Sequence, residues 1–269
     1  MISVITVCYN EEEHINSTIR SVFDQSYTDF EYIIKDGGSV DGTLIKVKRW
    51  EKAFESKGIK FTVISAADKG IYDAMNTAVL SAEGEFINFM NGGDCFASAG
   101  TLEKIFKDKD HRGADLIYGD TVEEEFGELH YFRKCPELIK ERMPFSHQSV
   151  FVRRELLLKY PFRMKYPIAA DYDFLLTLYE KGCTFKDSNT VVAKVTKDGK
   201  SSLRLKDTYL ESLALRKEHG IAVPEGAALK LKTLWLDIKQ FGMDHFPDGL
   251  KYMIRKVQRK MRGQKRYYT

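Results

Sequence analysis

Apolar runs alternate with helix-like segments along the first hundred residues of the chain. Residues 3–9 are β-branched and apolar on both faces, which is typical of a buried parallel strand. The polar segment that follows opens a helix that we expect to run from Asn10 to about Asp24. The same alternation continues with predicted strands and helices in turn at 30–35, 43–57, 60–65, 72–81 and from 86 onward. This order predicts an α/β fold with a mainly parallel sheet and helices on both of its faces.

The second half of the chain has a less regular pattern. Predicted elements there are a helix, a strand, one arm of a hairpin, a strand, a helix and a strand, at 98–107, 115–118, 127–132, 149–152, 171–181 and 190–195. From residue 206 the pattern is helical, with breaks at 220–224 and 242–247. We therefore expect a body of residues 1–204 and a helical extension of residues 205–269.

Composition and charge narrow the class of protein. A chain of 269 residues with 43% apolar residues can fill the core of one large domain. Its four cysteines form no CxxC pair, no secretory signal precedes them, and no stretch approaches the ~18 apolar residues of a membrane span. We therefore expect a cytoplasmic protein. Residues 205–269 hold 14 basic and 7 acidic residues, against 28 and 32 in the rest of the chain, which points to an anionic partner for the tail.

Asp94 ends an apolar run that breaks into a glycine turn. In the segment 86–94 (FINFMNGGD) it is the one carboxylate, and the run before it is typical of a buried strand. Ligands of α/β sheets bind at the carboxyl ends of strands, where a carboxylate suits a hard divalent cation that already carries phosphate oxygens. The alternative is a solvated turn aspartate, since Asp and Gly are ordinary turn residues.

Acidic turns follow three of the predicted strands: the turn from Asn10 to Glu12, the turn at Asp36 and the turn at Asp94. Parallel strands bring their carboxyl ends to one edge of a sheet, so these turns should gather there. The first two turns can hydrogen-bond a base and a ribose, while Asp94 holds a metal on a diphosphate. Taken singly, Asp36 is equally explained as a turn residue, and Glu12 as a favourable charge at a helix N-terminus.

In their order, these turns resemble the family-2 glycosyltransferases of the GT-A fold, especially bacterial members that build surface polysaccharides such as O-antigen or capsule. The resemblance spans roughly residues 1–204. It is carried by four matching segments, at 3–12 (SVITVCYNEE), 36–43 (DGGSVDGT), 68–76 (DKGIYDAMN) and 84–86 (GEF). It implies a Rossmann-like domain that binds a nucleotide-sugar.

The resemblance also implies roles for particular residues. Those assigned to the nucleotide-sugar are Thr6, Tyr9, Glu12, Asp36, Lys69 and Gly93. Lys69 would meet phosphate or sugar; it could equally be a solvated loop lysine. Asp94 matches the last carboxylate of the family's DxDD metal motif, and the implied cofactor is Mn²⁺ or Mg²⁺. Asn91 and Gly93 stand where the family has acids, so this chain has a reduced metal motif in which diphosphate and water would supply most of the ligands.

A second acidic centre lies in the segment 169–176 (AADYDFLL), at the start of a predicted helix. It resembles the family's ED segment, with Ala170 in place of the Glu. Sugar transfer needs a base that takes the proton of the acceptor hydroxyl, and Asp171 is the candidate. Asp173 is the competing candidate. Both could instead be acids that favour the N-terminus of the helix.

Two further segments resemble parts of bacterial relatives. Residues 144–149 (PFSHQS) match a segment near the acceptor cleft, so His147 could contact a phosphate or the acceptor; a lone histidine is equally often structural. Residues 199–202 (GKSS) are similar to a mobile loop of relatives or are a plain surface turn.

Residues 249–266 hold eight basic residues and no acid, with apolar residues at helical spacing. Such a helix could lie on an anionic membrane surface, or it could pack on the body with its lysines in solvent. Nucleic acid is the less expected partner, because aromatic residues are not interleaved with the basic ones.

Together these features predict an inverting glycosyltransferase on the inner face of the cell membrane. It would move a sugar from a nucleotide-diphosphate donor, with a UDP-sugar as the expected donor, to a hydroxyl of a lipid-linked glycan. The alternative is a catalytically idle subunit that binds sugar nucleotides in a polysaccharide assembly complex, suggested by the reduced metal motif and by Ala170. A nucleotidyltransferase would need a GxGxR-like phosphate loop, which the turn at 37–39 does not supply.

Overall fold

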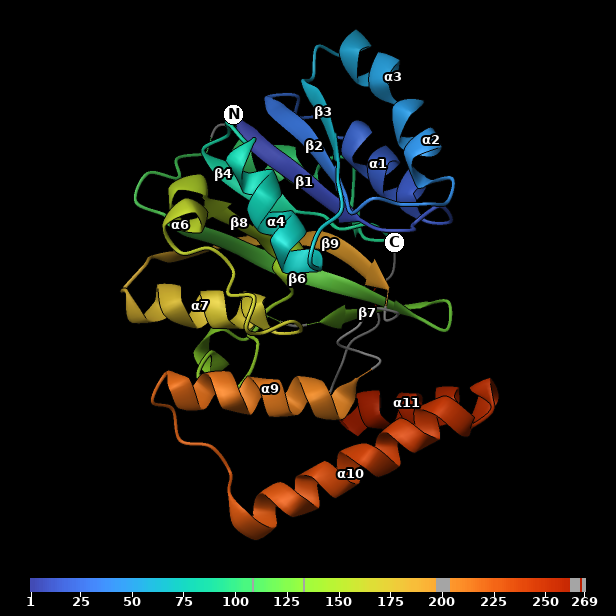
Figure 1. The fold of residues 1–269 in the computed structure, drawn as a ribbon, viewed down its shortest axis with the longest axis vertical. Helices are drawn as coiled ribbons and strands as arrows, with labels where there is room; N and C mark the ends of the chain where they lie inside the picture. The colour runs from blue at the N-terminus through green and yellow to red at the C-terminus, as the bar shows by residue number, and fades with distance from the viewer. Residues whose placement is uncertain (108, 133, 197–203, 262–266, 268–269) are drawn as a thin grey trace.

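A computed structural model describes the chain except for residues 108, 133, 197–203, 262–266 and 268–269. Its centre is a nine-stranded mixed sheet with the order β3-β2-β1-β4-β8-β6-β9-β5, with β7 paired to β6 (Figure 1). The strands are β1 (Ile2–Cys8), β2 (Phe30–Asp36), β3 (Phe61–Ser65), β4 (Phe86–Phe89), β5 (Cys95–Phe96), β6 (Leu116–Glu125), β7 (Glu128–Phe132), β8 (Val150–Arg153) and β9 (Phe185–Thr196). The mixed α/β class predicted from the sequence is confirmed.

The half of the sheet built from β1 to β4 is parallel. β1 lies between β2 and β4 and pairs with both in parallel, and β3 extends the sheet beyond β2. β8 then runs antiparallel to both β4 and β6, whereas β6 and β9 are parallel to each other. The carboxyl ends of β1, β2 and β4 therefore lie along one edge, as the alternating pattern predicted.

Helices cover both faces of the sheet (Figure 1). Those of the body are α1 (Ile15–Phe23), α2 (Thr43–Lys48), α3 (Glu51–Ser56), α4 (Ile71–Leu80), α5 (Thr101–Phe106), α6 (Arg154–Lys159) and α7 (Ala170–Glu180), with 3₁₀ turns η1 (Pro136–Leu138) and η2 (His147–Ser149). Alternate residues of β1 enter opposite clusters: Ile5 packs with α4 and α7, and Val4 packs with α1 and α3. Apolar residues on both faces of one strand are thus explained by burial on both sides.

Element boundaries depart from the prediction where turns compete with helices. The first helix begins at Ile15 and not at Asn10, because residues 10–14 form a turn in which Asn10 has a φ of 53°. The predicted helix at 43–57 is divided into α2 and α3 at Arg49–Trp50. The predicted strands at 115–118 and 190–195 are parts of the longer β6 and β9.

Three helices follow the body: α9 (Leu205–Glu218), α10 (Gly226–His245) and α11 (Asp248–Met261). α9 lies beside α7, and its Leu215 is fully buried in the same core cluster as α4 and α7 (Figure 1). A domain division at residue 204 stays a prediction, and α9 packs as part of the body. Within the described residues, no helix is long and apolar enough to span a membrane.

Candidate active site

The turns after β1, β2 and β4 are joined by backbone hydrogen bonds. Gly37 donates its N–H to the carbonyl of Cys8 at 2.9 Å, and Gly92 donates to the carbonyl of Val7 at 3.0 Å. Cys8 is also the register partner of Asp36. These bonds continue the parallel ladders past the strand ends, so the three acidic turns lie at one edge of the sheet.

Side chains bind the first two turns to each other. The N–H of Asn10 donates to the Ser39 hydroxyl at 2.8 Å, and the Asn10 side-chain oxygen accepts the N–H of Val40 at 3.0 Å. The carboxylate of Glu12 accepts the N–H of Gly42 at 3.0 Å. Asn10 can adopt its positive φ because asparagine tolerates the left-handed region. Glu12, assigned to the nucleotide by resemblance, thus holds the second turn in this structure.

Asp36 is fully buried, and its carboxylate organises its own turn. It accepts hydrogen bonds from the N–H groups of Gly38 and Ser39, at 3.0 and 3.1 Å, and from the Ser65 hydroxyl at 2.8 Å. Thr6 is also buried and donates to the carbonyl of Met90 at 2.6 Å. The contact of Asp36 and Thr6 with a nucleotide stays a prediction.

Tyr9 and Asp68 pack closely against Gly37 beside this turn. Tyr9 is 58% exposed, and a Cβ added at Gly37 would lie 2.7 Å from the Asp68 carboxylate and 3.3 Å from the Tyr9 ring. The buried Lys35 ammonium donates to the carbonyl of Ala66 at 2.6 Å and lies 3.3 Å from the Asp68 carboxylate. Only glycine at 37 leaves both side chains in place, so the surface that Tyr9 presents depends on it.

Lys69 follows Asp68 and has an exposed side chain. Its backbone N–H donates to the carboxylate of Asp73 at 2.9 Å, in the first turn of α4. The position of the side chain at the strand-end edge is compatible with a phosphate or sugar contact, which stays a prediction.

Asp94 is buried in the turn after β4, with 8% of its surface exposed. Burial raises the pKa of its carboxyl to about 6, although a 2.6 Å hydrogen bond from the Gln148 amide and the nearby His147 ring act in the opposite direction. The preceding Gly93 has a φ of 93° and donates its N–H to the Thr18 hydroxyl at 3.0 Å. The positive φ of Gly93 favours glycine at that position.

Asp171 lies in the first turn of α7 and contacts side chains from two other parts of the chain, α4 and η2. The Tyr72 hydroxyl lies 3.1 Å from its Oδ1, and the Tyr172 N–H donates to the same oxygen at 2.8 Å. Nδ1 of His147 lies 3.2 Å from its Oδ2, and Nε2 of His147 lies 2.8 Å from the Asn91 amide nitrogen. When the Asn91 amide donates to Nε2, the proton of a neutral His147 is on Nδ1 and faces Asp171.

Asp94 and Asp171 are therefore held by neighbouring residues of one 3₁₀ turn. His147 contacts Asp171, and Gln148 contacts Asp94, both from η2. The two predicted acidic centres, 77 positions apart in the sequence, thus belong to one cluster.

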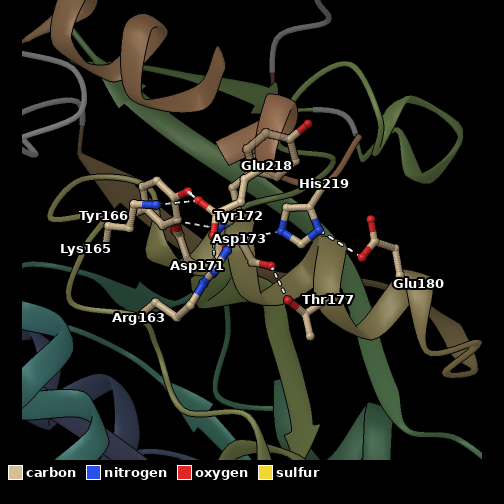
Figure 2. A network of polar contacts seen from close by, with 10 residues as sticks. All are labelled: Arg163, Lys165, Tyr166, Asp171, Tyr172, Asp173, Thr177, Glu180, Glu218 and His219. Carbon is tan, nitrogen blue, oxygen red and sulfur yellow. Dashed lines mark hydrogen bonds and ion pairs between the residues drawn. The ribbon is translucent and has the colours of Figure 1, made fainter. Parts of the chain in front are cut away.

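Asp173 faces a different part of the molecule. Its carboxylate is buried, accepts a 2.7 Å hydrogen bond from Nε of Arg163 and lies 2.9 Å from Nε2 of His219 (Figure 2). Residues two apart on a helix point in roughly opposite directions, so Asp173 is turned away from the side of α7 that bears Asp171. The carboxylate of Asp173 is thus occupied by Arg163 and His219, and the role of Asp171 as the base stays a prediction.

The donor set suits a metal that the nucleotide also ligates. In the described part of the chain no group of three or more His, Cys, Asp or Glu side chains could hold a metal. Asp94 supplies one carboxylate, and the side-chain oxygen of Asn91 is buried with no hydrogen-bond partner among the described residues. Hard oxygen donors of this kind fit Mg²⁺ or Mn²⁺ when diphosphate and water provide the other ligands.

Several residues of this cluster were not singled out from the sequence. Gln148 and Tyr72 lie inside matched segments, beside His147 and within residues 68–76, so their position was the available signal. Lys35 is in a strand that the pattern marked only as buried. The loop at 199–202 falls outside the described residues.

The α/β fold thus presents acidic turns at the ends of three parallel strands, with Asp94 and Asp171 joined through η2. A family model described as glycosyl transferase family 2 matches residues 3–166. The chain therefore belongs to glycosyl transferase family 2, and it is a glycosyltransferase. Asp171 lies five residues beyond the matched range.

A similar protein is named as a glycosyltransferase, and two solved structures share the fold. The PGL/p-HBAD biosynthesis glycosyltransferase of Mycobacterium tuberculosis is 28% identical over 229 residues, which cover 82% of this chain and 87% of the relative. The structure of S. aureus TarS 1-349 in complex with UDP-GlcNAc superposes with a TM-score of 0.64 at 20% identity, covering 90% of this chain and 72% of TarS. The mannosyltransferase PcManGT from Pyrobaculum calidifontis, in complex with GDP-Man and Mn²⁺, also gives 0.64, at 17% identity, with coverage of 96% and 80%. The predicted GT-A fold is confirmed.

Proposed function

We propose that this protein is an inverting glycosyltransferase that transfers a sugar from a nucleotide-diphosphate donor, a UDP-sugar in the first instance, to a hydroxyl of a lipid-linked glycan. The M. tuberculosis relative named for PGL/p-HBAD biosynthesis and the TarS complex with UDP-GlcNAc support this donor and this kind of pathway. The observation that carries the proposal is the single cluster in which η2 connects Asp94 to Asp171.

In this proposal each aspartate has its own task. Asp171 accepts the proton of the acceptor hydroxyl as that oxygen attacks the anomeric carbon, and Tyr72 and His147 hold its carboxylate in place. Asp94 would hold Mn²⁺ or Mg²⁺, which when bound supplies positive charge against the departing diphosphate. Tyr9, beside Gly37, offers an exposed ring for the base of the nucleotide.

The test is nucleotide release by the purified protein with a panel of UDP-, GDP- and dTDP-sugars, a lipid-linked glycan acceptor and Mn²⁺. Asp171→Asn should lower kcat by about 10²- to 10⁴-fold, the usual contribution of a general base, while donor binding is retained. Asp94→Asn should weaken metal-dependent binding of UDP. Asp207→Asn, at an exposed position of α9, is the matched control and should behave as wild type.

Two outcomes would contradict this proposal in different ways. Wild-type turnover in both Asp94→Asn and Asp171→Asn would remove their assigned roles. Calorimetric binding of UDP without transfer to any acceptor would instead support the idle sugar-nucleotide-binding subunit.

We also propose that the C-terminal helices place the protein at the inner face of the cell membrane, where a lipid-linked acceptor would lie. Exposed apolar residues recur at helical spacing on α10, at Leu231, Leu234, Trp235, Ile238 and Phe241. On α11 the most exposed are Met253 and Val257, at 63% and 59%. Lysines flank both stripes, as expected for a helix that lies on anionic lipid.

The two arginines of α11 within the described range have another task. Arg255 lies 3.1 Å from Glu125, and Arg259 pairs with Glu125 and Glu128 of the β6–β7 hairpin. They fasten α11 to the body, so membrane affinity in this proposal comes from the apolar stripes and the lysines. Part of the expected basic face of residues 249–266 is therefore used inside the protein.

Vesicle sedimentation tests the membrane proposal. Removal of residues 249–269 should lower binding to vesicles that contain phosphatidylglycerol and leave UDP binding unchanged. Trp235→Ser in the full-length chain should lower vesicle binding as well, with Tyr179→Ser, an exposed aromatic residue of α7, as the matched control. Equal sedimentation of wild type and both altered proteins would reject a membrane role for these helices.

A further inference from the structure

α9 reaches the start of α7 through one carboxylate. Oε1 of Glu211 accepts the backbone N–H of Ile168 at 2.8 Å and that of Ala169 at 2.7 Å. Ala169 is the N-cap residue of α7, and the candidate base Asp171 follows it by two positions. Hydrogen bonds from backbone N–H groups to a carboxylate are stronger than those between neutral groups. Glu211 thus restrains the peptide units that lead into α7.

The same short segment is held from its other side by Tyr72. The Tyr72 hydroxyl lies 2.8 Å from the carbonyl of Ile168 and 3.1 Å from Oδ1 of Asp171. Glu211 therefore binds the N–H of Ile168 while Tyr72 binds its carbonyl oxygen. A rotation of this segment would move the Asp171 carboxylate away from both Tyr72 and His147.

Glu211 is itself fixed because α9 is anchored to the body between Glu211 and the C-terminal end of the helix. One turn further along the helix, Leu215 is fully buried against α7. At the end of α9, Glu218 contacts Arg163, Lys165 and Tyr166, and the adjacent His219 lies between Asp173 and Glu180 (Figure 2). This network leaves α9 little freedom to slide along α7, so the position of Glu211 is set by the tertiary structure.

We propose that Glu211 is a positioning residue for Asp171: it orients the first turn of α7 so that the Asp171 carboxylate meets the acceptor hydroxyl. This inference rests on the proposed role of Asp171 as the base. It assigns a part in the transfer reaction to α9, a helix beyond the segment that the family model matches. Glu211 acts through the backbone of Ile168 and Ala169 and touches no reacting atom.

The experiment compares Glu211→Ala and Glu211→Gln with wild type and with Asp207→Ala, a change at an exposed carboxylate on the same helix. Glu211→Ala should lower kcat by about 10- to 100-fold, since a displacement of about 1 Å in a reacting group costs on the order of 10²-fold. The KM for the donor should stay near the wild-type value, because the nucleotide turns lie on β1 and β2. Glu211→Gln keeps an oxygen that accepts the two N–H groups and should restore most of the lost kcat.

Hydrogen exchange followed by mass spectrometry gives a readout that needs no turnover. In Glu211→Ala, peptides that include Ile168 and Ala169 should exchange faster than in wild type, whereas Asp207→Ala should leave them unchanged. If Glu211→Ala does not fold, Glu211→Asp, with a carboxylate one methylene shorter, takes its place in both measurements.

The outcomes separate this inference from the proposed function. Unchanged exchange at these peptides, or a wild-type kcat together with faster exchange, would overturn the positioning role of Glu211. A wild-type protein that transfers no sugar from any donor would reject the proposed function and with it the catalytic consequence for Glu211. An equal loss of kcat in Glu211→Gln and Glu211→Ala would also overturn the positioning role of Glu211, because the side-chain oxygen that accepts the two N–H groups would then make no difference to kcat.

Discussion

Replacement of Arg163 by methionine isolates the energetics of the contact between α7 and α9. Asp173 is 2% exposed, and Arg163 gives it a 2.7 Å hydrogen bond from Nε and a second from its terminal nitrogen. Loss of one partner of a buried ion pair costs about 3–5 kcal/mol, and here Asp173 is buried while the Arg163 side chain is 41% exposed. Because His219 remains 2.9 Å from the same carboxylate, we expect the low end, about 3 kcal/mol. The exposed contact between Arg163 and Glu218 adds at most about 1 kcal/mol.

Unfolding in guanidinium chloride, followed by circular dichroism, measures this loss. For a chain of this size 1 kcal/mol corresponds to about 2–4 °C in Tm, so Arg163→Met should melt about 6–12 °C below wild type. Asp173→Asn removes the buried charge, so the two changes should not be additive. The double variant Arg163→Met/Asp173→Asn should lose less unfolding free energy than the sum of the losses in the two single variants, by about 1 kcal/mol or more. A single-variant cost below about 1 kcal/mol, or additivity within about 0.5 kcal/mol, would refute the view that Asp173 is a buried charge that needs this partner.

Three other predictions concern the same helices and the site. Burial acts to lower the pKa of His219, but hydrogen bonds to two carboxylates outweigh this effect and raise the pKa. The stability that His219 contributes is therefore complete below its ordinary pKa of 6.5 and is lost as the pH rises through the raised pKa. His219→Gln should flatten that part of the pH dependence of the unfolding free energy, and an unchanged profile would contradict this. Tyr72→Phe removes a donor to Asp171 and should lower kcat about tenfold with little change in donor KM; an unaltered kcat would show that the hydroxyl does not orient the base. Gln148→Leu leaves Asp94 without its amide donor, so the pKa of Asp94 should rise further above its usual range. Mn²⁺-dependent UDP binding at pH 7, measured by calorimetry, should then weaken about tenfold. Equal affinity of the variant and wild type for UDP would show that Gln148 does not contribute to the metal site.

Local patterns were sufficient for most of the fold. The strands at 3–9, 30–35 and 60–65 are present within one or two residues. β1 and β2 are buried on both faces, which leaves a continuous apolar run in the sequence, whereas the edge strand β3 is half-buried and is marked by its β-branched residues. The two-residue strand β5 was not predicted, because Cys95 and Phe96 show no period and pair with β9 only in the tertiary structure. α6 was missed in the same way, at residues 154–159, where a short helix leaves little periodic signal.

The candidate site was predictable in its residue types and less so in its contacts. Asp94, His147 and Asp171 were named from motifs, and the structure brings them into one cluster through His147 and its neighbour Gln148. The buried carboxylate of Asp36 binds the backbone of its own turn, a contact that the motif did not reveal, and its contact with a base stays a prediction. Spacing along the chain does not reveal which of several hydrogen-bond donors a carboxylate will meet.

The sequence alone determined the α/β class, the parallel edge with its three acidic turns, and the family, because burial on both faces and glycine-rich turns constrain residues that are near each other in the chain. The tertiary structure decided that Asp171 and Asp173, two positions apart, face different partners, and that Glu211 reaches the start of α7. These contacts join residues 10 to 99 positions apart, and their geometry depends on how α7 and α9 pack, which no local pattern encodes.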